Sequence, residues 1–167
     1  MPIRLGSALV AVAVIATGRS GALAAQDSAA RPAIWAQAGL GVSTANLGGL
    51  VAASGASGSH LVSARASFVA ENFEGGDEET FDVAILYGRR LRSTGAFRPS
   101  ASAGIAYVKC EECDDGGNAS SVGLALSVEA ALWPTGFAGI GLHGFGNVNP
   151  IASFAGVAVT IHVGRLR

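Results

Sequence analysis

The chain has 167 residues, of which 50% are hydrophobic and 14% are charged, and it contains 24 glycines. Soluble domains carry about 25% charged residues, so this chain is poor in the residues that a water-facing surface needs. A mean hydropathy of +0.43 also excludes intrinsic disorder. The formal net charge of −1 disfavours nucleic acid as a partner, and the length fits one domain.

The first residues have the pattern of a secretory signal peptide. Arg4 precedes a largely apolar stretch, Leu5 to Thr17, and Ala22-Leu23-Ala24 then gives the small-x-small cleavage pattern. The apolar stretch is too short to cross a bilayer. We predict a signal peptide over residues 1–24 and a flexible lead-in over residues 25–33, with a short N-terminal membrane anchor as the alternative.

Apolar and polar residues alternate with a period of two after residue 33, which predicts β-strands. The clearest run is residues 119–132, where Val122, Leu124, Leu126 and Val128 share one face. The predicted strands cover residues 34–44, 49–57, 61–73, 81–88, 98–109, 119–132, 137–147 and 157–164, the second largely from its position. Strands of about ten residues match the length of a tilted membrane-spanning strand.

The composition of the polar face decides between two kinds of barrel. An eight-stranded barrel is either soluble with an apolar interior or membrane-bound with an apolar exterior. A water-facing wall would carry several charges on each strand, whereas this face is mostly Gly, Ser and Ala, which suit a cramped interior. The other face carries Phe81, Tyr87 and Tyr107 near strand ends, as an aromatic girdle would.

We therefore predict an all-β fold, an eight-stranded antiparallel up-and-down transmembrane β-barrel over residues 34–167, surrounded by outer-membrane lipid. A soluble lipocalin-like carrier and helical membrane folds are the alternatives. The glycines and Asn46 within residues 32–59, and Pro150 within residues 143–163, argue against spanning helices.

The charges separate towards the two ends of this barrel. With the N-terminus in the periplasm, most acids lie at two external loops: Glu71, Glu74, Asp77, Glu78, Glu79, Glu111, Glu112, Asp114 and Asp115. Arginines gather at the opposite end: Arg89, Arg90, Arg92, Arg98, Arg165 and Arg167. This polarity is consistent with a bacterial outer-membrane location and predicts a structural or surface-binding role through acidic external loops, with no particular ligand indicated.

Two segments resemble those of small outer-membrane β-barrel proteins: Leu86-Tyr87-Gly88-Arg89-Arg90-Leu91, which closes one strand, and Val157 to Arg167, which closes the chain. The resemblance is architectural and covers essentially all of the chain after the predicted signal peptide. In that family the final strand commonly ends in an aromatic residue that the assembly machinery recognises. Here the segment ends Gly164-Arg165-Leu166-Arg167.

Cys110-Glu111-Glu112-Cys113 is the most conspicuous local motif. One C-x-x-C without a second ligand pair is a weak zinc signal, and a redox role would need a thioredoxin-like βαβ context. In an oxidising compartment we expect Cys110 and Cys113 to form a disulfide at the tip of an exposed acidic loop. The neighbouring acidic segments lack the spacing of an EF-hand, so we expect no metal site and no cofactor.

Four charged residues are expected to face the lumen as a polar network: Arg65, Asp82, Arg98 and Glu129. Buried charges are normally paired, because an unpaired one is costly. A hairpin register with Ser100 opposite Glu129 places Arg98 diagonally next to Glu129. We predict an ion pair between Arg98 and Glu129.

The alternative function is that of a barrel enzyme acting on lipid, which would use a histidine, a serine and an acid at the membrane rim. His143 and His162 both lie on the predicted lumen face. However, no Gly-x-Ser-x-Gly motif marks a nucleophile. We expect these histidines to be hydrogen-bonded within the polar interior, and we assign no catalytic residue.

Overall fold

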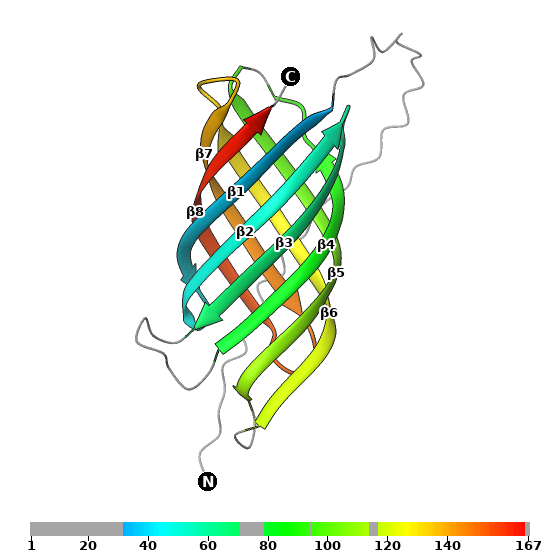
Figure 1. Ribbon diagram of the computed structural model, residues 1–167, viewed down its shortest axis with the longest axis vertical. Helices are drawn as coiled ribbons and strands as arrows, with labels where there is room; N and C mark the ends of the chain where they lie inside the picture. The colour runs from blue at the N-terminus through cyan, green and yellow to red at the C-terminus, as the bar shows by residue number, and fades with distance from the viewer. Residues whose placement is uncertain (1–31, 71–78, 94, 114–116, 166–167) are drawn as a thin grey trace.

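The chain folds into a closed antiparallel barrel in which each strand pairs with the next and β8 closes onto β1 (Figure 1). The computed structural model describes residues 32–70, 79–93, 95–113 and 117–165, with the side chains of residues 112 and 113 left out. The strands are β1 (Ala33–Ser43), β2 (Asn46–Ser57), β3 (His60–Ala70), β4 (Glu79–Arg90), β5 (Phe97–Cys113), β6 (Gly117–Leu132), β7 (Ala138–Val148) and β8 (Phe154–Arg165). Within these ranges, no helix is long and apolar enough to cross a membrane.

All of the predicted strands are present, and the predicted fold class is confirmed. The main difference is the length of β5, which extends through the cysteine motif as far as Cys113, with a register shift between Cys110 and Cys113. The motif was predicted to form a loop tip. The strand continues because the alternation does: Lys109 and Glu111 are exposed, and Cys110 between them is buried.

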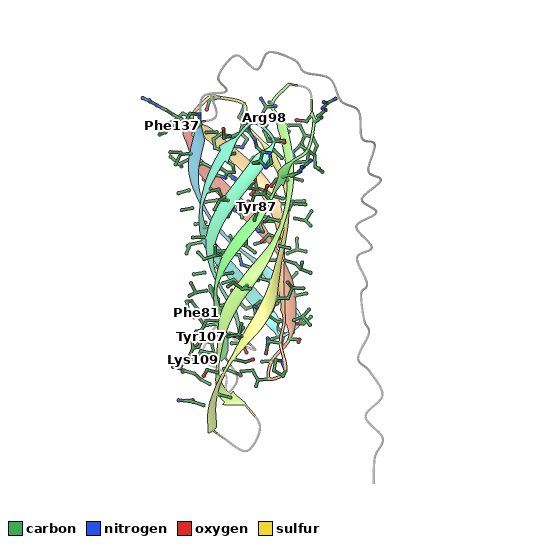
Figure 2. The ribbon with its side chains drawn as sticks, turned by 90° about the vertical axis from the view of Figure 1, so that its right-hand side faces the viewer. Phe81, Tyr87, Arg98, Tyr107, Lys109 and Phe137 are labelled. Atoms are coloured by element: carbon green, nitrogen blue, oxygen red, sulfur yellow. The ribbon has the colours of Figure 1, made fainter. Side chains whose placement is uncertain are left out.

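The apolar face predicted from the alternation is the outer face of the barrel. Val122 on β6 is 68% exposed and Ile161 on β8 is 65% exposed, and large apolar side chains are exposed on every strand. Figure 2 shows these side chains projecting from the wall along its whole height. A continuous apolar surface of this size belongs in lipid, so the barrel is of the transmembrane kind and the soluble lipocalin-like alternative is wrong.

The two ends of the barrel differ. We call one the terminal end, where β1 begins and β8 ends, and the other the loop end, where residues 71–78 and 114–116 connect strands. Phe137 and Arg98 lie towards the terminal end, whereas Phe81, Tyr107 and Lys109 lie towards the loop end (Figure 2). Exposed aromatic residues therefore border the apolar wall at both ends, as the predicted girdle requires.

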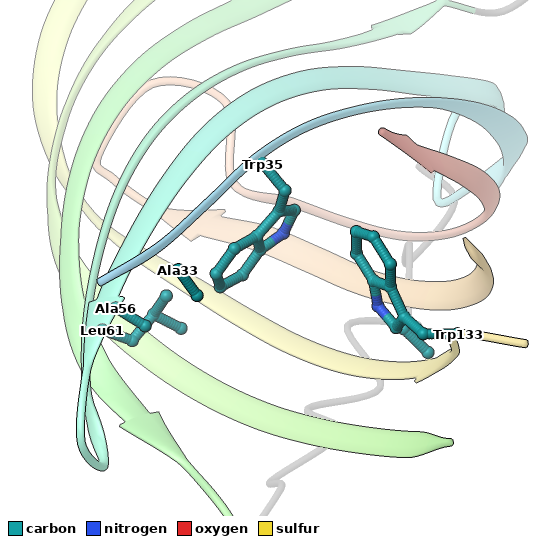
Figure 3. Close-up of a cluster of buried hydrophobic side chains, with 6 residues drawn as sticks. Ala33, Trp35, Ala56, Leu61 and Trp133 are labelled. Carbon is teal, nitrogen blue, oxygen red and sulfur yellow. The ribbon is translucent and has the colours of Figure 1, made fainter. Parts of the chain in front are cut away.

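Bulky apolar side chains occupy both ends of the lumen, where the sequence predicted mainly small residues. At the terminal end Trp35 and Trp133 pack with Ala33, Ala56, Leu61 and Ala131 (Figure 3). At the loop end the rings of Phe145 and Phe154 meet edge to face, with centroids 6.4 Å apart, beside Leu50 and Val69. The polar part of the lumen lies between these two clusters.

Neighbouring strands approach closely where the lumen contains glycine. A Cβ atom added to Gly104 on β5 would lie 1.9 Å from the backbone oxygen of Ile85 on β4, whereas a Cβ added to Gly55 on the outer face of β2 would meet no atom within 4 Å. Gly104 is therefore required by the packing of β4 against β5, and Gly55 is not.

We expect Gly104→Ala to destabilise the barrel by about 2 kcal/mol or more, because backbone must move to admit the methyl group. Gly55→Ala is the matched control and should fold as the native chain does. The measurement is the folded fraction after refolding into detergent, from the heat-modifiable mobility of the barrel on a gel. Equal folded fractions for the two variants would contradict this account of the packing.

Candidate functional site

The centre of the lumen is held by a buried ion pair between Arg65 on β3 and Asp82 on β4. The distance from Arg65 Nη2 to Asp82 Oδ2 is 2.8 Å, and neither side chain is accessible to solvent. Two further groups donate to the same carboxylate, the hydroxyl of Ser67 and the amide of Asn147, the latter at 3.0 Å. The charge of Asp82 is therefore compensated by one cation and two neutral donors.

Arg65 also reaches across the lumen to the far wall. Its Nη1 donates to the backbone oxygen of Leu126 at 2.8 Å and to Ser127 Oγ at 2.9 Å, both on β6, and its Nη2 donates to the backbone oxygen of Gly146 on β7 at 3.3 Å. The guanidinium carbon lies 5.9 Å from the centroid of the Phe145 ring. One side chain thus ties four strands together.

A second polar group lies towards the terminal end and is centred on Glu129 of β6. Its Oε2 lies 3.6 Å from His143 Nδ1 and its Oε1 lies 3.9 Å from His162 Nδ1. Gln37 of β1 approaches His143 Nδ1 through its Nε2 at 3.0 Å, and His143 Nε2 lies 3.1 Å from Ser127 Oγ. Ser127 also receives a hydrogen bond from Arg65, so it connects the two groups.

The ring of His162 is held in place through Nε2, the nitrogen that faces away from Glu129. Its Nε2 lies 2.8 Å from Thr160 Oγ1, and the ring of Trp133 meets the imidazole edge-on with centroids 5.6 Å apart. His143 and His162 are both buried in the lumen, as predicted. Among the described residues, no group of three or more His, Cys, Asp or Glu side chains is arranged to hold a metal ion.

Ser127, His143 and Glu129 lie next to one another as the nucleophile, base and acid of a serine hydrolase would. The hydrogen bonds around them do not fit that chemistry. When Gln37 Nε2 donates to His143 Nδ1, that nitrogen must be an acceptor, so Nε2 carries the hydrogen and cannot take a proton from Ser127. Arg65 also donates to the same hydroxyl. The adjoining cavity has a volume of about 10 Å³, room for one water molecule and not for a lipid.

The predicted network is brought together only in part. Arg65 and Asp82 pair with each other, and Glu129 lies in the lumen. The predicted register is confirmed, since Ser100 pairs with Glu129. The structure does not bring Arg98 to Glu129: its Nη1 donates to the backbone oxygens of Gly95 at 2.7 Å and Phe97 at 3.2 Å.

The difference has a physical reason. Arg98 lies at the start of β5, at the terminal end of the barrel, where carbonyl groups of the turn and water can solvate its charge. Glu129 lies deeper and faces His143 and His162 instead. Gln37 and Asn147 also belong to the network, although neither was predicted to. Their inward-facing positions on β1 and β7 were the one sequence feature that could have predicted their place in the network.

Comparison with solved structures shows the same fold in small outer-membrane barrels. Neisserial surface protein A (NspA) aligns over 79% of this chain and 94% of its own, with a TM-score of 0.57 and 11% sequence identity. The N-terminal β-barrel domain of Pseudomonas aeruginosa OprF aligns over 79% of this chain and 96% of its own, with a TM-score of 0.61 and 10% identity.

A solved structure described as "De novo design of transmembrane beta-barrels" has a TM-score of 0.53 and 13% identity over 79% of this chain and 94% of its own. No protein-family model and no curated protein matches the sequence. At these identities the similarity shows the fold alone. The resemblance to small outer-membrane β-barrel proteins is confirmed as an architectural one.

We expect Arg65→Met to destabilise the barrel by about 3–5 kcal/mol, because it leaves the Asp82 carboxylate buried without its cation. The double variant Arg65→Met/Asp82→Leu should recover more than half of that loss, since no buried charge then remains. Arg98→Gln is the control and should change stability by less than about 0.5 kcal/mol, because Arg98 bonds to the backbone oxygens of Gly95 and Phe97 at the barrel end and to no buried charge.

The free energy of unfolding of each variant is measured by urea titration in detergent. A double variant that is less stable than Arg65→Met would contradict the argument from buried charge. So would an Arg98→Gln variant that loses as much stability as Arg65→Met.

Proposed function

We propose that this protein is a bacterial outer-membrane barrel that anchors acidic external loops, through which it binds a cationic partner at the cell surface. The observation that carries the proposal is the combination of a lipid-compatible outer wall with a lumen filled by side chains. An eight-stranded barrel leaves an interior that side chains just fill. The cavity beside Glu129 and His143 holds no more than about one water molecule.

The filled lumen supports an anchoring role over transport. Apolar side chains pack inside both ends of the barrel, and Arg65 and Asp82 cross-link the strands between them. Within the described residues, the cavity at the polar centre has a volume of only about 10 Å³, too small for a substrate larger than water. The parts left to make specific contacts are then the connections outside the membrane, and binding residues are disproportionately found on loops held by a rigid scaffold.

The charges at the loop end support a cationic partner. Glu79 and Glu111 are exposed and lie directly opposite each other on β4 and β5. Like charges in such a pair destabilise a sheet, and here one cation is already present, since Lys109 Nζ lies 2.5 Å from Glu111 Oε1. The other acids of this end lie in or beside residues 71–78 and 114–116, outside the described residues. A cationic ligand would relieve the repulsion between Glu79 and Glu111.

The orientation in this proposal follows from the chain ends. We infer a secretory signal peptide over residues 1–24 that delivers the chain to the periplasm; with the N-terminus kept on that side, the terminal end faces the periplasm and the loop end faces outward. Residues 1–31, which include the predicted signal peptide and most of the lead-in over residues 25–33, lie outside the described residues. β1 begins at Ala33.

Binding of fluorescent polylysine to protein reconstituted in neutral phosphatidylcholine vesicles tests this function. We expect Glu79→Gln/Glu111→Gln to weaken binding at low salt by about threefold, the size expected for exposed charge pairs. The matched control is Lys109→Gln at the same place, which removes a positive charge and should strengthen binding. Salt above about 0.5 M should abolish binding to every form.

Two results would refute the surface-binding role. One is equal polylysine affinity for Glu79→Gln/Glu111→Gln and the native chain. The other is failure of the protein to float with the vesicles, which would remove the membrane location itself.

We also infer that Cys110 and Cys113 form a disulfide that constrains the end of the β5–β6 hairpin. They are the only two cysteines of the chain, and an oxidising compartment favours their pairing. Cys110 is buried on the inward face, 3.3 Å from Thr80 Oγ1, so the bridge would lie against the barrel wall. The small ring limits its stabilisation to less than the roughly 3 kcal/mol expected of a 15-residue loop.

A thiol assay on the unreduced, denatured protein is expected to find no free thiol. Reduction should then alter the hairpin end and leave the heat-modifiable mobility of the barrel unchanged, because the strand ladder holds the barrel together. Two free thiols per chain would refute the bridge.

A further inference from the structure

The outer wall of the barrel is hollowed over β1, β2 and β3. The groove has a volume of about 660 Å³. Its lining includes Val51, together with Val83, Ile161 and Val163 from β4 and β8, and much of it is made up of outward-facing alanines: Ala36, Ala38, Ala53, Ala64 and Ala66. The wall here therefore has room for a chain-like apolar molecule.

Small outward residues extend along β2 from the groove to the terminal end. The outward residues that follow Ala53 on this strand are Gly55 and Ser57. Nothing lies within 4 Å of the position of a Cβ at Gly55. From Ala53 to Ser57 is about 13 Å along a strand, and no side chain larger than serine projects from β2 over that distance.

A polar and basic cluster lies where these small residues end. Ser57, His60 and Arg89 form one row across β2, β3 and β4, since Ser57 pairs with His60 and His60 pairs with Arg89. All three are exposed, and the Tyr87 hydroxyl lies 2.6 Å from His60 Nδ1. Arg90 is engaged with the backbone oxygen of Gly58 at 2.6 Å.

The hydrogen-bonding capacity of this cluster suits a phosphate. With Tyr87 donating to His60 Nδ1, the other ring nitrogen carries a hydrogen and can donate outward. No ion pair links Arg89 to an acid within the described part of the chain. Its guanidinium can therefore give the paired, charge-assisted hydrogen bonds that phosphate oxygens accept.

We propose that the groove and this cluster together bind one phospholipid with a net negative headgroup. The phosphate contacts Arg89 and His60, one acyl chain passes Ser57 and Gly55, and its tail fills the alanine-lined groove. This inference rests on the membrane location under the proposed function. It adds a specific lipid site to a wall that otherwise meets lipid only through general apolar contact.

Charge complementarity favours a lipid over a second copy of the chain. A second copy inserted in the same membrane would have the same orientation and would present its own Arg89 and His60 beside the first. Like charges brought together at an interface cost several kcal/mol. An anionic phospholipid supplies the negative charge, and its flexible chain can follow a narrow groove.

Native mass spectrometry of the full chain in detergent tests the site. The probes are dioleoylphosphatidylglycerol, dioleoylphosphatidylcholine with the same acyl chains, and inorganic phosphate. We expect one phosphatidylglycerol per chain, retention of phosphatidylcholine weaker by about tenfold, a factor that corresponds to about 1.4 kcal/mol, and no retained inorganic phosphate.

Two variants separate the headgroup from the chain. Arg89→Gln should remove the preference for phosphatidylglycerol and leave phosphatidylcholine binding unchanged. Ala53→Leu fills the groove and should lower the retention of both lipids. The matched controls are Lys109→Gln, which removes an outward cation at the loop end, and Ala130→Leu, which enlarges an outward alanine on β6 away from the groove. Neither control should change lipid retention.

The proposal is overturned if the variants behave as their controls do, if inorganic phosphate is retained as strongly as the lipid, or if a second copy of the chain displaces the lipid. Heat-modifiable mobility shows that each variant is folded. Flotation with vesicles separates the two proposals: a chain that does not float refutes the membrane location, whereas a chain that floats but retains no phosphatidylglycerol refutes the lipid site alone.

Discussion

Every backbone N–H and C=O group inside a bilayer must find its partner within the protein, and the closed ladder from β1 to β8 meets that requirement. Closure fixes what each side chain can do. Because successive side chains of a strand point to opposite faces, every second residue faces lipid and must be apolar, as Ile105 and Val122 are. The residues in between enter a narrow lumen, where most polar side chains find their partners on other strands, as Arg65 and Gln37 do.

Most of the charged and polar groups of the lumen are bonded to a few long side chains. Arg65 holds Asp82 and also bonds to groups on β6 and β7 on the far side of the barrel. Glu129 lies between two histidines, and Gln37 reaches one of them from β1. These contacts engage the atoms that a serine hydrolase would need, since Ser127 receives a hydrogen bond from Arg65 and His143 Nε2 lies 3.1 Å from the same hydroxyl.

Much of the fold could be predicted from the sequence because alternation is a local property. Face assignments for β6 and β8 follow from consecutive residues, and even the pairing of Ser100 with Glu129 follows from the parity of two strands that share a hairpin. Partners inside the lumen are not local. Gln37 and His143 are 106 residues apart, and Arg65 and Gly146 are 81 apart. Parity places such residues in the lumen without indicating their height or reach, which is why Arg98 was assigned to Glu129.

The outer wall contains a further asymmetry that alternation does not reveal. Outward positions need only be apolar, so period-two patterning treats Ala53 and Val122 alike, although one lines a groove and the other projects into lipid. The alanines of β1, β2 and β3 form a continuous hollow only because the register aligns Ala36 with Ala53 and Ala53 with Ala64. The register of β3 against β4 brings His60 beside Arg89 at the terminal end. Strand pairing thus converts residues that are unremarkable one by one into a surface with an apolar part and a cationic part, the two properties that an anionic lipid combines.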